Sequence, residues 1–236
     1  MRSFARRSDE LEWMDDPNVA PDVLAACLKD LAKVNTVTLA RPPTLKWLAG
    51  AVRSFRPGAA FSLLDVGFGQ GDMLRAIYAW ARKAKLNASL TGIDLSPYSA
   101  PAARAATDPA WPITYLVGDI FTYAPPEPPD FVVSSLVAHH MTDEQLARFI
   151  AWMDEKSRRG WFVNDLHRHP FAYYGFKALS ATAGWHPFVR HDGPLSVARA
   201  FRRPDWERVL AASGVARSNV AVSWRFPFRL CVGRIK

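Results

Sequence analysis

The chain has 236 residues, of which 49% are hydrophobic and 22% are charged. That length suits one α/β domain with an appendage and is long enough to bury a complete core. No apolar run approaches the roughly 20 residues that cross a membrane, and residues 1–17 lack the apolar core of a secretory signal. We therefore expect a cytoplasmic protein without a membrane span.

The charge balance is basic, with 30 Lys and Arg residues against 22 Asp and Glu residues and a formal net charge of +8. Such a charge can attract nucleic acid or an anionic surface. The basic residues are scattered, however, and form no run of the about five to eight residues that mark a nucleic-acid patch. Nucleic acid is therefore a disfavoured partner. The two cysteines, Cys27 and Cys231, lie far apart in apolar sequence, which favours buried free thiols in a reducing cytoplasm.

Residues 1–60 have the pattern of a helical segment that precedes the first strand. Pro21 suits a first helical turn, and an apolar stripe at helical spacing follows it: Val23, Leu24, Cys27, Leu28, Leu31 and Val34. Two prolines at 42 and 43 interrupt the pattern, and Leu45 to Val52 resume it. The sequence predicts an N-terminal helical cap over residues 1–60.

A glycine loop follows the first predicted strand, Phe61–Val66, and precedes a helix predicted over Met73–Ala84. Gly67, Gly69 and Gly71 occupy alternate positions in it. Glycine can adopt a positive φ, and the missing Cβ lets a ligand lie against the backbone. The helix that follows offers free N–H groups and the positive end of its dipole. This pattern predicts a nucleotide site.

The nature of the nucleotide depends on the spacing of the glycines and on the next two strands. A dinucleotide fingerprint needs glycine at position 72, where this chain has Asp72. The second predicted strand ends in Gly92-Ile93-Asp94-Leu95-Ser96, and the third, Ile113–Val117, in Gly118-Asp119-Ile120-Phe121. Together these three strand ends resemble the first three motifs of class I S-adenosylmethionine (SAM)-dependent methyltransferases.

The resemblance implies SAM as cofactor and assigns it to specific positions. The implied cofactor-binding residues are Asp65, Gly67, Gly69, Gly71, Asp94, Leu95, Asp119, Ile120 and Ser135. The glycines would cradle the methionine part, Asp65 would lie near its amino group, and Asp94 can accept both ribose hydroxyls. Asp119 and Ile120 would bind the adenine, although Asp119 could instead be a solvent-exposed acid in a loop. Ser135 would face the cofactor, or bond the backbone as a buried hydroxyl.

The middle of the chain continues the alternation of strands and helices. A helix is expected near Tyr98–Ala106, and a proline-rich loop then leads into an apolar strand at residues 130–136. Thr142, with Gln145 three residues later, has the pattern of a capping box that begins the next helix. A fifth strand follows at residues 160–166. Strands that alternate with helices imply a parallel, doubly wound sheet, with ligands at the carboxyl ends of its strands.

The end of the chain has a different pattern. A helix predicted at Pro204–Ser213 precedes two strand-like runs, Val215–Trp224 and Phe228–Ile235, whose short link makes them an antiparallel hairpin. The predicted fold class is thus α/β, with a doubly wound, mostly parallel seven-stranded Rossmann-like sheet and a C-terminal antiparallel hairpin. The predicted methyltransferase domain covers residues 61–236, and residues 167–203 are an aromatic insertion over the acceptor pocket. In relatives of this fold, N-terminal helices often cover the cofactor; an ordinary bundle on the sheet edge is the alternative.

The sequence after the fourth strand bears on the acceptor. Val137-Ala138-His139-His140-Met141 resembles the His-His-Leu/Phe signature of ubiquinone/menaquinone-type methyltransferases. The Asn/Asp-Pro-Pro-Tyr motif typical of nucleic-acid amino methyltransferases is absent. Residues 164–170 and 191–196 resemble a bacterial subgroup thought to act on polyketide or quinone-like aromatics. The resemblance therefore implies a small-molecule acceptor that is methylated on oxygen or carbon.

Two histidines are the candidate catalytic bases, because an imidazole with a pKa near 6.5 can take the proton of a phenol or enol. His140 and His167 follow the fourth and fifth strands. Either histidine could instead only orient its loop, and Asp165 with Arg168 could form a structural ion pair. No histidine spacing on one helix face indicates a metal site.

The expected function is SAM-dependent methyl transfer to a small aromatic acceptor by a chain that could form a homodimer. Three other functions remain open. They are an RNA-modifying methyltransferase, a nicotinamide oxidoreductase and a non-catalytic binding module that retains the cofactor.

Overall fold

A single seven-stranded sheet forms the centre of the protein, which we describe from a computed structural model over residues 3–16 and 18–236. Its strands are β1 (Ala60–Val66), β2 (Asn87–Asp94), β3 (Ile113–Val117), β4 (Phe131–Ser135), β5 (Gly160–Leu166), β6 (Val220–Arg225) and β7 (Arg229–Ile235). Their spatial order is β3-β2-β1-β4-β5-β7-β6. The first five strands are parallel, whereas β7 is antiparallel to both β5 and β6. The predicted fold class is confirmed.

Eight α-helices surround the sheet in the described residues. They are α1 (Pro21–Val37), α2 (Pro42–Ala51), α3 (Asp72–Lys83), α4 (Ser99–Ala105), α5 (Asp143–Lys156), α6 (Pro170–Thr182), α7 (Pro187–Arg199) and α8 (Arg203–Ala212). Two short 3-10 turns, η1 (Trp13–Asp15) and η2 (Ala138–His140), complete the set. None of these described helices is both long enough and apolar enough to cross a membrane.

The core has two layers because successive strand residues face opposite sides of the sheet. On one side, Leu63, Phe131 and Val133 pack against α2, α3 and α4. On the other side, Val132 and Val163 pack against α5 and α8. Both faces are thus covered, which explains why the inner strands are apolar throughout. The two cysteines are free and buried, as predicted.

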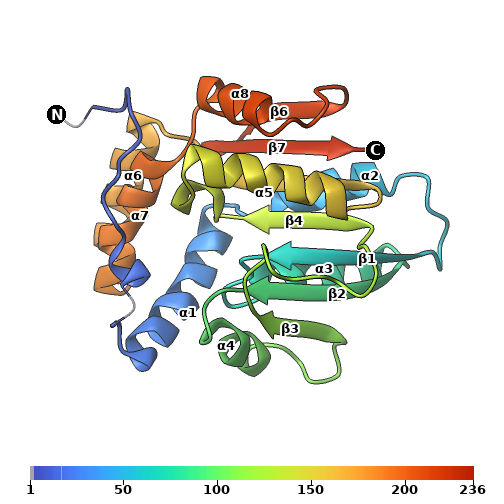
Figure 1. Cartoon of the computed structure of the whole chain (residues 1–236). Coiled ribbons are helices and arrows are strands. Elements are labelled where there is room, and N and C mark those ends of the chain that lie inside the picture. Colours follow the sequence, from blue (N-terminus) through green and yellow to red (C-terminus); the bar gives the residue numbers. More distant parts are fainter. Residues whose placement is uncertain (1–2, 17) are drawn as a thin grey trace.

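The remaining helices lie at the carboxyl ends of the parallel strands. Figure 1 shows α1, α6 and α7 together at the end of the sheet toward which the arrows of β1, β2 and β4 point. The predicted helices over residues 21–52 are present as α1 and α2, but residues 3–12 are extended rather than helical. That segment follows α7, where Ser8 N–H donates to the Ala198 carbonyl at 3.0 Å and Arg7 Nε to the Arg199 carbonyl at 2.7 Å.

The structure adds helices to the predicted aromatic insertion and shortens one predicted strand. The aromatic insertion forms α6 and α7, each of which begins with a proline preceded by a histidine. His169 Nδ1 and His186 Nδ1 accept the first free backbone N–H groups of these helices, from Phe171 and Phe188. The strand predicted from Val215 begins only at Val220.

The capping box predicted for α5 is present and gives a direct test of local stability. Thr142 Oγ1 accepts from Gln145 N–H, and the Gln145 side chain accepts from Thr142 N–H. Replacing Thr142 with Ala should lower the free energy of unfolding by about 1 kcal/mol, because a helix N–H loses its partner. Urea denaturation measures the change. The matched control is Thr182→Ala in the last turn of α6, which should change stability by less than about half as much; equal effects would contradict the assignment.

Candidate functional site

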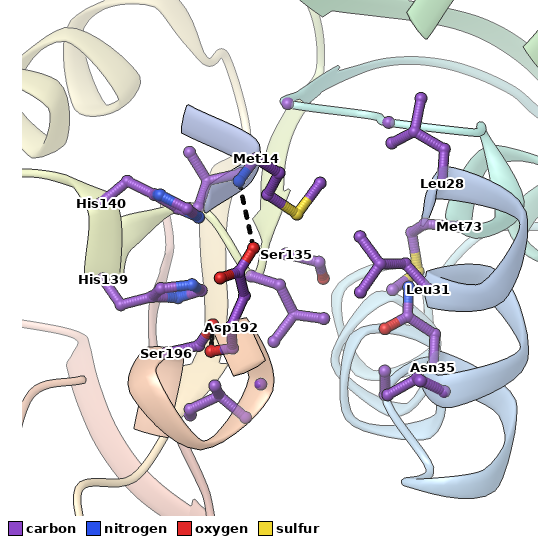
Figure 2. A pocket seen from close by; sticks show the side chains of 18 of the residues that line it. Met14, Leu28, Leu31, Asn35, Met73, Ser135, His139, His140, Asp192 and Ser196 are labelled. Atoms are coloured by element: carbon purple, nitrogen blue, oxygen red, sulfur yellow. Dashed lines mark hydrogen bonds between the residues drawn. The ribbon is translucent and has the colours of Figure 1, made fainter. Parts of the chain in front are cut away.

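A cavity of about 700 Å³ lies at the carboxyl ends of the parallel strands. Residues from the loops after β1, β2, β3 and β4 form its floor, and residues from α1, α6 and α7 form its walls. Figure 2 shows Leu28, Leu31 and Asn35 of α1 on one side, with His139 and His140 on the other. The lining is largely apolar with polar groups at distinct places, as in many small-molecule sites.

The glycine loop after β1 is held tightly between its neighbours. Gly67, Gly69 and Gly71 have φ values of 75°, 53° and 75°, which side-chain-bearing residues rarely adopt. A Cβ on Gly67 would lie 2.3 Å from Val137, and one on Gly71 would lie 2.7 Å from the Tyr115 hydroxyl. A Cβ on Gly69 would meet only Leu28 of α1, at 3.8 Å. The backbone at Gly69 is therefore open toward the space under α1.

Asp65, at the end of β1, is a buried acid that lines the cavity. Within residues 3–16 and 18–236, neither of its carboxylate oxygens has a hydrogen-bond partner. Burial, together with the nearby carboxylates of Asp72 and Asp94, raises its pKa well above 3.8. A buried carboxyl without donors is costly, so this position favours a ligand with a cationic or hydrogen-bond-donating group.

The acids after β2 and β3 occupy the next part of the cavity. Asp94 accepts hydrogen bonds from Gly69 N–H at 2.8 Å and Ser96 N–H at 2.9 Å, so it ties the glycine loop to the end of β2. Burial nevertheless raises the pKa of Asp94. Asp119 is exposed and accepts from Phe121 N–H at 2.9 Å, which is a turn hydrogen bond. Ile120 is buried beside it and lines the same space.

Helix α1 covers this part of the cavity. Its Leu24, Leu28 and Leu31 side chains line the space. At its far end, Asn35 Nδ2 donates to Asp72 Oδ1 at 3.4 Å, which links α1 to the first residue of α3. The apolar stripe that predicted this helix therefore faces the cavity as well as the core.

His139 is fixed by the buried carboxylate of Asp165. Asp165 accepts His139 N–H at 2.8 Å and pairs with His139 Nδ1 at 2.7 Å. Because the carboxylate can only accept, Nδ1 carries a proton, and in the neutral ring Nε2 therefore has the free lone pair. Burial raises the pKa of Asp165, but His139 and the backbone N–H groups outweigh it, and the net shift is downward.

His140 and Glu12 complete this end of the cavity. His140 Nδ1 lies 3.3 Å from Asp15 Oδ2, which fixes its tautomer in the same way. Glu12, from the extended N-terminal segment, lies with Oε1 3.8 Å from His139 Nε2 and Oε2 3.9 Å from His140 Nε2. Its Oε1 also accepts from Ser196 Oγ of α7 at 2.9 Å. Burial raises the pKa of Glu12 to about 7.

The sequence and fold match known methyltransferases. A family model described as a methyltransferase domain matches residues 63–160. This part of the chain is therefore similar to a methyltransferase domain. The plantazolicin methyltransferase BpumL, solved with a desmethyl-plantazolicin analogue and S-adenosylhomocysteine (SAH), has a TM-score of 0.63 at 16% identity, over 92% of this chain and 96% of that chain.

Two further methyltransferases share the fold. Magnesium protoporphyrin IX methyltransferase from Synechocystis, solved with SAH, has a TM-score of 0.54 at 17% identity over 84% of each chain. Human N-acetylserotonin methyltransferase, solved with SAM, has a TM-score of 0.60 at 13% identity over 92% of this chain and 56% of that chain. No curated protein matches the sequence significantly.

The fold brings most of the sequence-predicted residues to one cavity. Eight of the nine predicted cofactor-binding residues line it: Asp65, Gly67, Gly69, Asp94, Leu95, Asp119, Ile120 and Ser135. Gly71 lies behind them, as the residue that precedes α3, against Tyr115. Ser135 Oγ lies 3.5 Å from Thr44 Oγ1 of α2.

The two predicted catalytic histidines have different positions. His140 lines the cavity, whereas His167 does not. Leu166 faces the cavity, and alternation along the extended chain turns His167 away from it. His167 N–H donates to the Phe228 carbonyl at 2.9 Å, and its ring lies beside His169. Burial, together with the positive charges of neighbouring side chains, lowers its pKa.

Sequence reasoning missed the partners of the histidines. Asp165 was considered as an ion-pair partner of Arg168, but it bonds His139, and Arg168 pairs with Asp205 at 2.9 Å. No sequence pattern marked Glu12 as a site residue, because it is one of several acids in a segment without periodicity. Only the path of residues 3–16 across the cavity brings it to the histidine pair.

The unpartnered Asp65 predicts an unusual stability effect. Because its pKa is raised in the folded state, the folded protein holds this proton to higher pH than the unfolded chain. The free energy of unfolding should therefore fall as pH rises above about 3.8. In Asp65→Asn the pH-dependent loss should disappear, and at neutral pH without ligand the variant should be more stable by at least about 1 kcal/mol.

Urea denaturation of both proteins between pH 4 and 8 measures this difference. Asp108→Asn serves as the control, because Asp108 is an exposed aspartate in a turn. An Asp65→Asn variant that is less stable than the wild type at neutral pH would contradict the assignment.

Proposed function

We propose that the protein is a SAM-dependent methyltransferase that acts on an oxygen or carbon of a small, aromatic, quinone-like or polyketide-like acceptor. The observation that carries this proposal is the pairing of an unpartnered, buried Asp65 carboxylate with an open glycine backbone at the floor of one cavity. That pairing suits the ammonium-bearing methionine part of the cofactor. The SAM and SAH bound in similar structures support the same cofactor.

Different residues of the chain would bind different parts of the cofactor. Asp65 would accept hydrogen bonds from the ammonium group, and the backbone of Gly67 and Gly69 would contact the chain of the methionine part. Each oxygen of Asp94 accepts one backbone N–H, and the carboxylate, which also bonds the Ser99 side chain, would accept hydrogen bonds from the ribose hydroxyls. Asp119 and Ile120 offer a carboxylate and an apolar wall to the adenine. When bound, the cofactor supplies an electrophilic methyl group on its sulfonium.

The rest of the cavity supports an apolar acceptor with one polar group. Its wall from α6 and α7 presents Phe171, Phe176, Leu179 and Val189. Its polar end presents the Nε2 atoms of His139 and His140 beside Glu12. A hydroxyl on the acceptor would lose its proton at this end of the cavity. His140, expected from the sequence, shares this position with His139.

The main contribution of the protein would be alignment in a water-poor cavity. In-line displacement from a sulfonium requires the acceptor atom and the methyl group to be held in register, and such positioning can contribute several kcal/mol. Helix α1 lines one side of the cavity, whereas α7 and the segment before α1 line the other, so these elements would keep water away from the ligands. The N-terminal helices thus act as a cap over both ligands in this proposal.

Calorimetric titration tests the cofactor assignment. SAM and SAH should bind at micromolar concentrations and NADH should not. Asp94→Ala should weaken binding of both sulfur ligands by roughly 10- to 100-fold, because hydrogen bonds to a charged group contribute about 1.5–3 kcal/mol. The control is Asp108→Ala, which also removes a turn aspartate but lies outside the cavity. Binding of NADH without either sulfur ligand would overturn the proposal.

Methyl transfer to a panel of phenols and quinols tests the acceptor end. With an accepted substrate, His139→Ala should lower kcat by about 10²-fold, the scale of lost proton transfer, while SAM affinity changes little. His167→Ala should change kcat by less than about two-fold, because its ring lies outside the cavity. If His167→Ala abolishes turnover and His139→Ala does not, this arrangement of the acceptor site is wrong.

A further inference from the structure

We propose that Glu12, His139 and His140 bind a divalent transition-metal cation of the zinc type at the acceptor end of the cavity. The three side chains come from two distant parts of the sequence, the extended N-terminal segment and the turn η2 after β4. Each offers one ligand atom, and these atoms all lie within 4.8 Å of one another. Two imidazoles and one carboxylate are a donor set found in catalytic zinc sites, where further positions stay open for water or substrate.

The distances indicate a site for an ion rather than a set of direct hydrogen bonds. Glu12 Oε1 and Oε2 lie 3.8 and 3.9 Å from the two histidine Nε2 atoms, too far for hydrogen bonds. Ligand atoms about 2.0–2.2 Å from one cation lie roughly 3–4 Å from each other. A cation would therefore fit among these atoms with small side-chain movements.

Both histidines are oriented as metal ligands are. In metal sites, a ligating histidine usually donates its other ring N–H to a carboxylate, which sets the tautomer and the ring orientation. Here His139 Nδ1 pairs with Asp165 at 2.7 Å and His140 Nδ1 with Asp15 at 3.3 Å. Both free Nε2 lone pairs are thereby directed toward Glu12. In Figure 2 the two rings lie one above the other and point into the cavity.

The surrounding charges also favour a divalent cation. Three carboxylates contact the histidine pair, those of Glu12, Asp15 and Asp165. The one guanidinium in the described residues that bridges two of them is Arg199, 3.0 Å from Asp15 and 3.8 Å from Glu12. When both imidazoles are neutral and Glu12 is ionised, this group carries two excess negative charges. A divalent cation balances them.

The role of this cation rests on the proposed function, although the binding site itself does not. A divalent cation lowers the pKa of a hydroxyl that it binds. The acceptor would release its proton to water and present an oxyanion to the methyl group. The new bond joins the acceptor to the methyl carbon, the methyl–sulfur bond breaks, and SAH leaves as a neutral thioether at its sulfur.

The cation would also tie the N-terminal segment to the floor of the cavity. Glu12 is the ligand from that segment, and its neighbours Trp13 and Met14 donate backbone N–H groups to Asp192 of α7 at 2.9 and 3.1 Å. A ligand that binds only the folded state raises its stability by mass action. Metal binding should therefore raise the melting temperature even without SAM or acceptor.

Metal titration of the chelator-treated full chain tests the proposal without any turnover. Calorimetry with Zn²⁺, and the visible absorption of Co²⁺ as a substitute, should show one equivalent bound to the wild type. Glu12→Gln and His140→Ala should each weaken Zn²⁺ binding by at least about 100-fold. Asp165→Asn, which keeps every ligand, should weaken it by about 10- to 100-fold. His167→Gln is the matched control and should bind Zn²⁺ as the wild type does.

Other outcomes distinguish a failure of the metal site from a failure of the proposed function. Binding that is equal in the wild type, Glu12→Gln and His140→Ala, or no binding to the wild type, would overturn the metal site. SAM binding to each variant shows that it is folded, because the cofactor residues are not changed. Zn²⁺ binding without SAM binding would keep this site and refute the proposed function, whereas SAM binding without Zn²⁺ binding would do the reverse.

Discussion

The cost of burying charge determines how the cavity is organised. Most of its buried carboxylates are matched by donors of the protein, such as Asp165 by His139 and Asp192 by the backbone of Trp13 and Met14. Within the described residues Asp65 has no hydrogen-bond donor, whereas Glu12 accepts from Ser196 Oγ and has the Arg199 guanidinium 3.8 Å away. A buried carboxylate without a partner is unfavourable, so a protein retains it where a ligand supplies the missing positive charge. These two acids therefore mark the two ends of the cavity at which cationic ligands are proposed to bind.

The two ends depend on different parts of the fold. The Asp65 end is built from parallel strands and a glycine loop so tightly packed that a Cβ on Gly67 would lie 2.3 Å from Val137. The Glu12 end is built across elements far apart in sequence, since residues 3–16, η2 and α7 meet there. The first end is fixed by the sheet itself. The second forms only when the N-terminal segment lies in place.

The fold, and the gathering of the proposed cofactor-binding residues at one cavity, were predictable because their signals are local. Strand-length apolar runs, alternate glycines and acids at strand ends lie within a few residues of each other, and the capping box of Thr142 and Gln145 lies within one turn. The acceptor end was only partly predictable. His140 lies next to a strand end, but Glu12 reaches it through tertiary structure, and no local pattern places His167 outside the cavity. The repeated His-Pro-Phe in the sequence marks the first residues of α6 and α7. These helix starts were not predicted, because the insertion was interpreted from its aromatic content alone.

Hydrogen exchange with and without SAH tests most directly whether the glycine loop and α1 form one ligand site. If they do, SAH should slow exchange in peptides from residues 67–73 and from α1 together, while peptides from β6 at the far edge of the sheet stay unchanged. Protection in both regions would support a cofactor enclosed between the sheet and the N-terminal helices. Protection confined to other surfaces, or none at saturating SAH, would contradict the account.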